Sequence, residues 1–194
     1  MPIKIKKVKF LKSASSVSGF PQYSYPEFAF MGRSNVGKSS LINMVTGQKS
    51  LVKVGSKPGV TKTINFFLLN DKISLADLPG FGYAKLPGNI RKTFLPLIKD
   101  YIKIRDNLKL GFLLVDIRRE PAGFEKDIIT FLSEEEIPTA IIATKCDKLS
   151  KNKIMHSVKT IAVNLEIDAE SIFVTSSHSG LGRNEMLNLI EEYS

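Results

Sequence analysis

The sequence has very little cysteine and histidine. Among its 194 residues, Cys146 is the single cysteine, and His156 and His178 are the two histidines. A lone cysteine cannot form an intramolecular disulfide, and these three residues make no zinc or haem constellation. We therefore expect any bound metal to have oxygen ligands.

Long hydrophobic runs are also missing. No segment approaches the roughly 18 apolar residues that a membrane-spanning helix needs. The lysine-rich start, MPIKIKKVKFLK, has no apolar core of the kind found in secretory signals. These absences predict a cytoplasmic protein that does not insert into a membrane.

The remaining composition is that of a globular protein, with 43% hydrophobic and 24% charged residues. The length predicts a single domain over residues 1–194, in which 1–24 form a basic N-terminal extension or an edge strand. The formal net charge of +9 favours a polyanionic partner, with nucleic acid the leading candidate. The alternative is that the lysines only keep the protein in solution.

Strand and helix patterns alternate along the chain. Apolar runs typical of strands lie at 28–31, 64–70, 72–77, 111–117, 139–144 and 171–176. Helical spacing lies at about 39–47, 89–106, 124–136, 150–165 and 182–193. This order predicts an α/β fold with about six strands, mostly parallel, one antiparallel edge strand and helices on both faces. Residues 8–14 are a possible added edge strand.

A phosphate loop lies between the first of these strands and its helix. It comprises Gly32, Arg33, Ser34, Asn35, Val36, Gly37, Lys38 and Ser39. Glycines let successive backbone N–H groups surround phosphate oxygens. We expect Lys38 to reach the β- and γ-phosphates and the Ser39 hydroxyl to bind Mg²⁺.

A second loop follows the strand at 72–77 and consists of Asp77, Leu78, Pro79 and Gly80. An aspartate at the end of a strand can contact magnesium through water, and the N–H of Gly80 can approach a γ-phosphate. The long segment 48–63 between these loops contains Thr61, whose hydroxyl is a further candidate magnesium ligand. Asp-x-Pro-Gly is also a common turn, so the functional interpretation of this loop rests on its position after a strand and beyond the phosphate loop.

Two segments near later strand ends are candidates for base recognition. They are Thr144, Lys145, Cys146 and Asp147, and then Ser176, Ser177 and His178. The Asp147 carboxylate can accept hydrogen bonds from the ring N–H and the amino group of guanine, a pair that adenine lacks. If this tetrapeptide stood alone, the default interpretation of Lys145 and Asp147 would be a solvated ion pair in a loop.

In this order, the four segments resemble the motif series of the Ras-like GTPase fold. Nearly the whole chain resembles the EngB (YsxC, YihA) family of bacterial small GTPases, through GRSNVGKSSLIN, SKPGVTKTINFF, DLPGFGYAK, TKCDKLS and TSSHSGLG. The resemblance implies a Mg²⁺-dependent protein that binds GTP and GDP and hydrolyses GTP. It also implies a role in assembly of the large ribosomal subunit and a link to septation at cell division.

The resemblance assigns roles to positions of this chain. The first switch falls on Gly59, Val60, Thr61, Lys62 and Thr63, and the second on Asp77 through Gly80. It implies that Ser39 and Thr61 hold magnesium and that Lys38, Thr61 and Gly80 support catalysis. Thr144 replaces an asparagine of the general pattern, which removes an amide that normally ties loops together. His178 stands where many relatives of the wider fold have lysine.

Phe81 is the departure with the largest consequence, since Ras-type enzymes have a water-orienting glutamine there. A phenyl ring neither orients nor deprotonates water, so we expect slow intrinsic hydrolysis. Two routes to acceleration stay open: a K⁺ ion held with the help of Asn35, or the ribosome. For Asn35, tolerance of the turn geometry is an equal alternative.

The basic residues form two clusters in the sequence. One consists of Lys4, Lys6, Lys7, Lys9 and Lys12, and the other of Lys85, Arg91, Lys92, Lys99, Lys103 and Arg105. Both are expected to contact the large ribosomal subunit or its rRNA through backbone phosphates, with the protein a monomer. One alternative is a GTP-gated scaffold at the division septum with little hydrolysis. Another, a nucleoside monophosphate kinase, would need an arginine-rich lid, yet the chain has six arginines.

Overall fold

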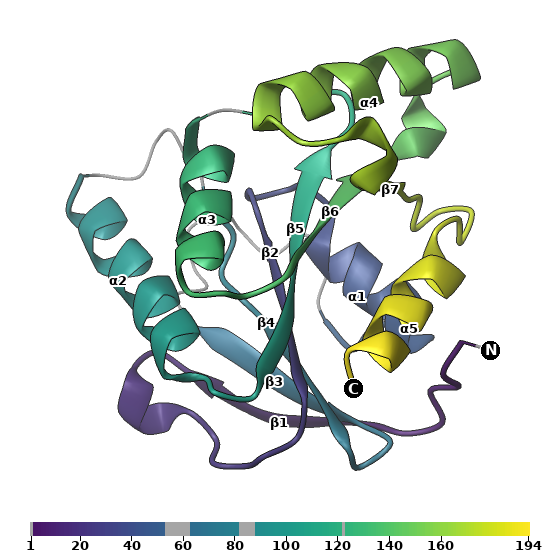
Figure 1. Ribbon diagram of the computed structural model, residues 1–194. Helices are drawn as coiled ribbons and strands as arrows, with labels where there is room; N and C mark the ends of the chain where they lie inside the picture. The colour runs from purple at the N-terminus through teal and green to yellow at the C-terminus, as the bar shows by residue number, and fades with distance from the viewer. Residues whose placement is uncertain (1, 53–62, 82–87, 122) are drawn as a thin grey trace.

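The computed structural model describes residues 2–52, 63–81, 88–121 and 123–194, with the backbone alone for 88–95. These residues form a seven-stranded sheet in the order β1-β3-β4-β2-β5-β6-β7 (Figure 1). The strands are β1 Val8–Ala14, β2 Glu27–Gly32, β3 Ile64–Leu69, β4 Ile73–Asp77, β5 Leu108–Asp116, β6 Thr139–Thr144 and β7 Ile172–Val174. The pairs from β4 through β7 are parallel, whereas β3 is antiparallel to both β4 and β1.

Helices cover both faces of the sheet. They are α1 Lys38–Thr46, α2 Gly88–Ile104, α3 Gly123–Glu134, α4 Lys151–Leu165 and α5 Arg183–Glu192. One buried cluster joins α2, α3 and α4 to the sheet, and a second joins α1 and α5 to the opposite face (Figure 1). No helix in the described part of the chain has the length and hydrophobicity to cross a bilayer. The predicted α/β class is confirmed.

The central strands owe their position to their composition. Residues 110–116 of β5 are all buried, as is the whole of β2. Continuous apolar runs of this kind suit parallel strands that have helices on both faces. The helix after β2 is bounded by glycines in left-handed conformations, Gly37 at φ 109° and Gly47 at φ 68°.

The antiparallel side of the sheet contains one more strand than predicted. The turn between β3 and β4 has Asn70 at φ 49° and Asp71 at φ 57°, and these left-handed values suit a two-residue hairpin. Residues 8–14 pair with β3 as the edge strand β1, so the antiparallel strand β3 is second from the edge. The alternative of an added edge strand is therefore confirmed, and the sheet has seven strands.

A buried ion pair lies at the opposite end of β2 from the phosphate loop. The fully buried Glu27 accepts hydrogen bonds from Arg105 Nε at 2.8 Å, Arg105 Nη2 at 2.9 Å and the Tyr101 hydroxyl at 2.8 Å. Only 6% of Arg105 is exposed. The prediction that Arg105 belongs to a surface cluster is therefore wrong, because a buried carboxylate requires a cationic partner.

Candidate nucleotide-binding site

The four predicted motif segments follow the carboxyl ends of parallel strands. The phosphate loop follows β2, the segment from Leu78 follows β4, Lys145 follows β6 and Thr175 follows β7. Carboxyl ends of parallel strands share one edge of a sheet, which is where ligands bind in open α/β folds. Gly59, Val60, Thr61 and Lys62 lie outside the described residues, and so does Lys85.

The phosphate loop turns sharply between β2 and α1. Asn35 has φ 63° and Gly37 has φ 109°, both in the left-handed region. The Gly32 Cα has no space for a side chain, since a Cβ there would lie 2.9 Å from Val36 Cγ1. The buried Val36 thus fixes the interior of the loop, while the side chain of Asn35 is exposed.

Lys38 and Asp77 meet at the start of α1. The Lys38 ammonium donates a hydrogen bond to Asp77 Oδ1, and the Asn65 amide donates to Asp77 Oδ2 at 3.3 Å. Asp77 is buried at the end of β4. The structure therefore joins the phosphate loop and the loop from Asp77 to Gly80 through a charge pair.

The residues after Asp77 pack closely on the phosphate loop. A Cβ on Gly80 would lie 3.1 Å from Ser34 Cα, which is a tight contact with the backbone of the phosphate loop. The backbone N–H of Phe81 donates to Gly32 O at 3.1 Å, and the N–H of Ser34 donates to Phe81 O at 2.8 Å. The Phe81 ring is buried, with its centroid 4.5 Å from that of Phe124 in α3. It packs in the interior.

Thr144 ties two loops together, contrary to the expectation drawn from its replacement of asparagine. Its hydroxyl donates to Val36 O in the phosphate loop at 2.6 Å and lies 3.2 Å from Val115 O. The threonine hydroxyl thus makes the connection that loss of an amide was expected to remove. The sequence motif alone did not indicate this, because the contact of the Thr144 hydroxyl with Val36 O spans 108 residues of the chain.

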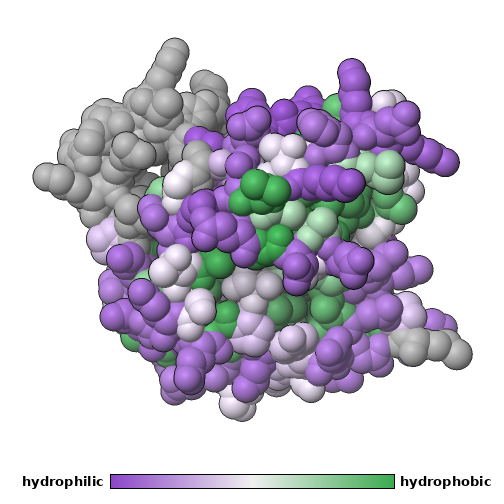
Figure 2. Space-filling model, turned by 45° about the horizontal axis from the view of Figure 1, so that its top comes forward, coloured by the Kyte–Doolittle hydropathy of each residue, from purple (hydrophilic) through white to green (hydrophobic). Residues whose placement is uncertain are grey.

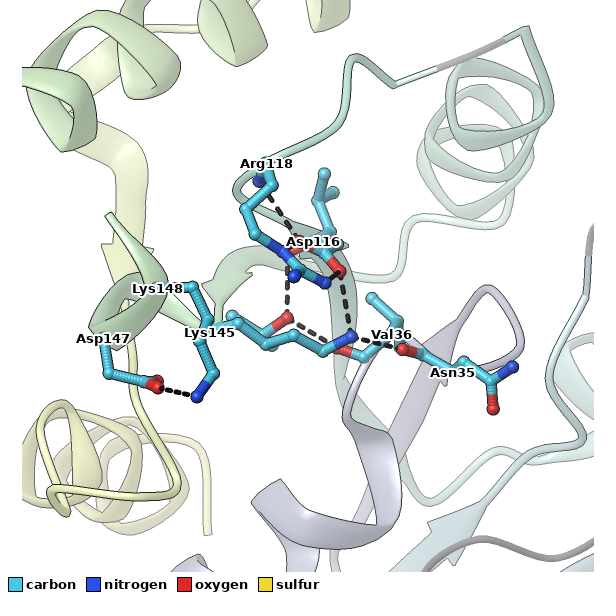
Figure 3. Close-up of polar contacts among 9 residues, drawn as sticks. Asn35, Val36, Asp116, Arg118, Lys145, Asp147 and Lys148 are labelled. Carbon is cyan, nitrogen blue, oxygen red and sulfur yellow. Dashed lines mark hydrogen bonds and ion pairs between the residues drawn. The ribbon is translucent and has the colours of Figure 1, made fainter. Parts of the chain in front are cut away.

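Lys145 crosses the phosphate loop, as Figure 3 shows. Its ammonium donates to Asn35 O at 2.5 Å and to Asp116 Oδ2 at 2.9 Å. Its stem passes over Gly37, where a Cβ would lie 3.5 Å from Lys145 Cε. The alternative of a solvated pair with Asp147 is wrong, because the partners of Lys145 lie on β5 and the phosphate loop.

Asp147 is held by the loop after β7. The Ser176 hydroxyl donates to Asp147 Oδ1 at 2.7 Å, and Ser176 Oγ accepts from the N–H of His178 at 3.2 Å. The hydrogen bond from Ser176 is the main cause that lowers the pKa of Asp147, partial burial opposes it, and Lys148 adds to the lowering. The carboxylate is therefore ionised near neutral pH and able to accept hydrogen bonds from a base.

The donor chemistry beside the phosphate loop fits magnesium. Ser39, in the first turn of α1, supplies a hydroxyl, and Asp77 supplies a carboxylate. Mg²⁺ prefers such oxygen ligands and usually completes its shell with phosphates and water. Within the described residues, no group of three or more His, Cys, Asp or Glu side chains forms a metal site of its own.

Sequence reasoning missed Asp116 and Asn65. Both contact residues of the predicted motifs, Lys145 and Asp77 respectively. Asp116 belongs to no short motif, Asn65 lies in the segment SKPGVTKTINFF without a role predicted for it, and their partners are 29 and 12 residues away in the chain. The position of Asp116 at the carboxyl end of a strand was the one available signal.

Comparisons with known proteins agree with this geometry. The model of a family described as 50S ribosome-binding GTPase matches residues 27–145. The probable GTP-binding protein EngB of Desulforapulum autotrophicum is 47% identical over 182 residues, which cover 94% of each chain.

Solved structures give the same fold. A crystal structure of a probable GTP-binding protein EngB matches with a TM-score of 0.72 and 28% identity, covering 86% of this chain and 97% of that chain. Era of Aquifex aeolicus bound to GDP·AlF₄⁻ matches with a TM-score of 0.68 and 18% identity, covering 88% of this chain and 57% of that chain. The likeness to Era concerns the fold alone, and that fold is the predicted Ras-like one.

Proposed function

Because the chain belongs to the EngB family of GTP-binding GTPases, we propose that it is a magnesium-dependent switch acting in assembly of the large ribosomal subunit. Its nucleotide state would control binding to the subunit, with a further link to septation at cell division. The family description, 50S ribosome-binding GTPase, supports this partner. We further propose that the chain acts in the cytoplasm as a single-domain monomer over residues 1–194. Figure 2 shows one face of the molecule, on which hydrophilic side chains surround a central hydrophobic area.

The observation that carries the guanine assignment is the position of Asp147. Its carboxylate is oriented by Ser176, and the same loop is clasped to the phosphate loop through Thr144 and Lys145. A fixed carboxylate accepts two hydrogen bonds from guanine, whereas adenine would leave it unpaired. We assign the segment Ser176, Ser177 and His178 to the guanine carbonyl. Within it, the N–H of Ser176 donates to Leu181 O and that of His178 donates to Ser176 Oγ, so the assignment rests on the N–H of Ser177.

Phosphate binding is assigned to Gly32 through Ser39. The N–H groups of the loop and of the start of α1 would surround the phosphates, and Lys38 would neutralise charge on the β- and γ-phosphates. Ser39 and Thr61 would bind Mg²⁺, which supplies further stabilisation of the charge that develops during phosphoryl transfer. Asp77 would act near the metal, and Gly80 would meet the γ-phosphate.

Slow intrinsic hydrolysis follows from the place of Phe81. Its ring is buried against Phe124, so it has neither the chemistry nor the exposure needed to orient water. We propose that a K⁺ ion near Asn35 or the ribosome supplies the missing stabilisation. The left-handed φ of 63° at Asn35 also fits the alternative that the residue serves the turn alone.

We propose that lysines of the N-terminal segment and of α2 form the surface that contacts the ribosomal subunit. Lys99 and Lys103 project from α2, where the Lys99 ammonium lies 5.1 Å from the Phe131 ring centroid and Lys103 lies 3.6 Å from Glu135. Changing Lys92, Lys99 and Lys103 to Glu should weaken subunit binding and leave nucleotide affinity unchanged. Subunit binding at the wild-type level would remove this patch from the proposal.

Measuring GTP turnover by the purified chain tests the proposed activity. We expect slow release of phosphate from GTP, none above background from ATP, and loss of turnover when Mg²⁺ is removed. Turnover in K⁺ should exceed turnover in Na⁺ at equal ionic strength if Asn35 helps to hold a cation. Equal rates would eliminate the potassium route, and GTP binding without turnover would favour the septum scaffold.

A further inference from the structure

Asp116 is a buried carboxylate at the carboxyl end of β5, outside the motifs assigned above. It is 6% exposed and makes a two-pronged contact with Arg118, whose Nε lies 2.9 Å from Oδ1 and whose Nη2 lies 2.8 Å from Oδ2 (Figure 3). The backbone N–H of Arg118 also donates to Oδ1 at 3.1 Å. Charge-assisted contacts of this geometry hold a carboxylate in one orientation.

The same carboxylate holds Lys145. Asp116 Oδ2 lies 2.9 Å from the Lys145 ammonium, which also donates to Asn35 O at 2.5 Å. The ammonium is therefore fixed between β5 and the phosphate loop. Burial raises the pKa of Asp116, but hydrogen bonds from Arg118 and Lys145 outweigh it, so the net pKa lies well below its usual value. Asp116 thus remains an anion under ordinary conditions.

We propose that Asp116 is a positioning residue that holds Lys145 across the phosphate loop and so prolongs the residence of a bound guanine nucleotide. This inference rests on the proposed function. Lys145 connects the base-recognition loop to the phosphate loop, and without Asp116 its ammonium would face the Arg118 guanidinium with no intervening negative charge. Repulsion between these cations would weaken the contact between Lys145 and the phosphate loop.

The Arg118 side chain allows a test that separates the positioning role of Asp116 from a purely structural role in the turn after β5. The side chains of Arg118 and Lys145 share Asp116 Oδ2, so removal of the Arg118 side chain leaves that oxygen to Lys145. Loss of the Arg118 side chain should therefore leave the contact between Lys145 and the phosphate loop as strong as before or stronger. If Asp116 served only to fix the turn after β5, loss of either partner of the Asp116–Arg118 pair would disturb the site in the same direction.

Release of GDP with an N-methylanthraniloyl label on its ribose tests the proposal when excess unlabelled GDP is added. Asp116→Asn keeps the size of the side chain and should speed release by about tenfold or more, as expected for loss of a charged hydrogen bond. Arg118→Met should not speed release. In a Lys145→Met background, Asp116→Asn should add nothing, because the residue through which it acts is gone.

Three outcomes would overturn the proposal: an unchanged release rate in Asp116→Asn, an equal acceleration in the Lys145→Met background, or acceleration by Arg118→Met comparable with that of Lys145→Met. The last comparison decides the matter even if Asp116→Asn does not fold, since the Arg118 side chain is 41% exposed and tolerates removal. Failure of the wild-type chain to bind labelled GDP would instead contradict the proposed function.

Discussion

The Arg105 guanidinium shows how much one side chain contributes at the end of the sheet away from the nucleotide site. It donates to both oxygens of the buried Glu27 and to Pro21 O at 2.9 Å, and it lies 4.9 Å from the Tyr23 ring centroid. These contacts join the segment before β2 to the residue that follows α2. The pair anchors the carboxyl end of α2.

Arg105→Met should lower the free energy of unfolding by about 3–5 kcal/mol, because it leaves the Glu27 carboxylate buried without a cation. Urea unfolding monitored by circular dichroism measures this change. The matched control is Lys103→Met, which removes an exposed cation 3.6 Å from Glu135 and should cost less than about 1 kcal/mol. Equal costs for the two variants would contradict the buried-pair account.

Ser176 sets the acid limit of nucleotide binding through Asp147. Its hydrogen bond is the main cause of the lowered pKa of Asp147, so the carboxylate remains charged as the pH falls below its usual pKa. Affinity for guanine nucleotides should be full above the usual aspartate pKa and should be lost as the pH falls through the lowered pKa of Asp147. Ser176→Ala removes the main stabilisation of the anion and should move this loss to higher pH.

Titration of GDP affinity from pH 7 down to about pH 3, which passes through the ordinary aspartate pKa, measures the shift. Thr160→Ala is a suitable control, since the Thr160 hydroxyl donates to His156 O within α4. Superimposable pH profiles for wild type and Ser176→Ala would show that the hydroxyl does not set the ionisation of Asp147.

At the level of elements, three neighbouring strands carry a row of side chains toward the phosphate loop. Ser13 of β1 pairs with Asn65 of β3, and Asn65 pairs with Asp77 of β4. The Asp77 carboxylate accepts from the Asn65 amide at 3.3 Å, and the Asn65 carbonyl accepts from the Ser13 hydroxyl at 2.5 Å. The edge strand thus supports the orientation of the candidate metal-side carboxylate.

Asn65→Leu keeps the size of the side chain but removes the donor to Asp77. The Mg²⁺ concentration for half-maximal GTP turnover should rise by about threefold to tenfold, as expected for one hydrogen bond. Ser13→Ala, one step further from the metal side, should raise it less. An unchanged requirement for Mg²⁺ in Asn65→Leu would separate this row of side chains from the metal.

Elements with strong local signals could be predicted from the sequence. The spacing predicts a helix over 89–106, and α2 spans Gly88–Ile104, while the Asn70–Asp71 turn marks the β3–β4 hairpin. The edge strand β1 was less certain because it has exposed positions at Lys9, Phe10, Lys12 and Ser13. Edge strands lack the continuous apolar run of a central strand.

The phosphate loop could be predicted because its chemistry is contained in eight consecutive residues. The Arg105 and Asp116 contacts could not, because their partners lie 78 and 29 residues away and are brought close only by the fold. Charge alone made Arg105 part of a surface cluster. Periodicity also extended the helix past Ile104, whereas Arg105 turns inward after its end.

At the scale of the whole molecule, the net charge of +9 predicts salt-sensitive binding to RNA. Lys7 and Lys9 lie 2.7 Å and 2.8 Å from the carboxylate oxygens of Asp71, which partly satisfies both cations. Changing Lys4, Lys6 and Lys12 together to Gln should reduce the slope of log affinity against log salt by about 2, if each contacts one phosphate. Changing Lys7 and Lys9 should reduce it less.

Filter binding to rRNA fragments gives these slopes. The KCl concentration is varied from about 50 to about 300 mM, around the physiological value of roughly 150 mM. A slope that is the same for the wild-type chain and the triple variant would show that the N-terminal lysines do not contact phosphates. The nucleotide affinity of both variants should equal that of the wild type, because β1 lies at the far edge of the sheet from β6 and β7.

Co-sedimentation of the purified chain with ribosomal subunits measures whether the bound nucleotide controls binding to the large subunit. The subunits are presented with a non-hydrolysable GTP analogue, with GDP or with no nucleotide, at near-physiological salt. We expect the chain to bind the large subunit with the GTP analogue and to bind it little or not at all with GDP. Binding that does not depend on the nucleotide, or no binding at all, would contradict a GTP-controlled role on the large subunit.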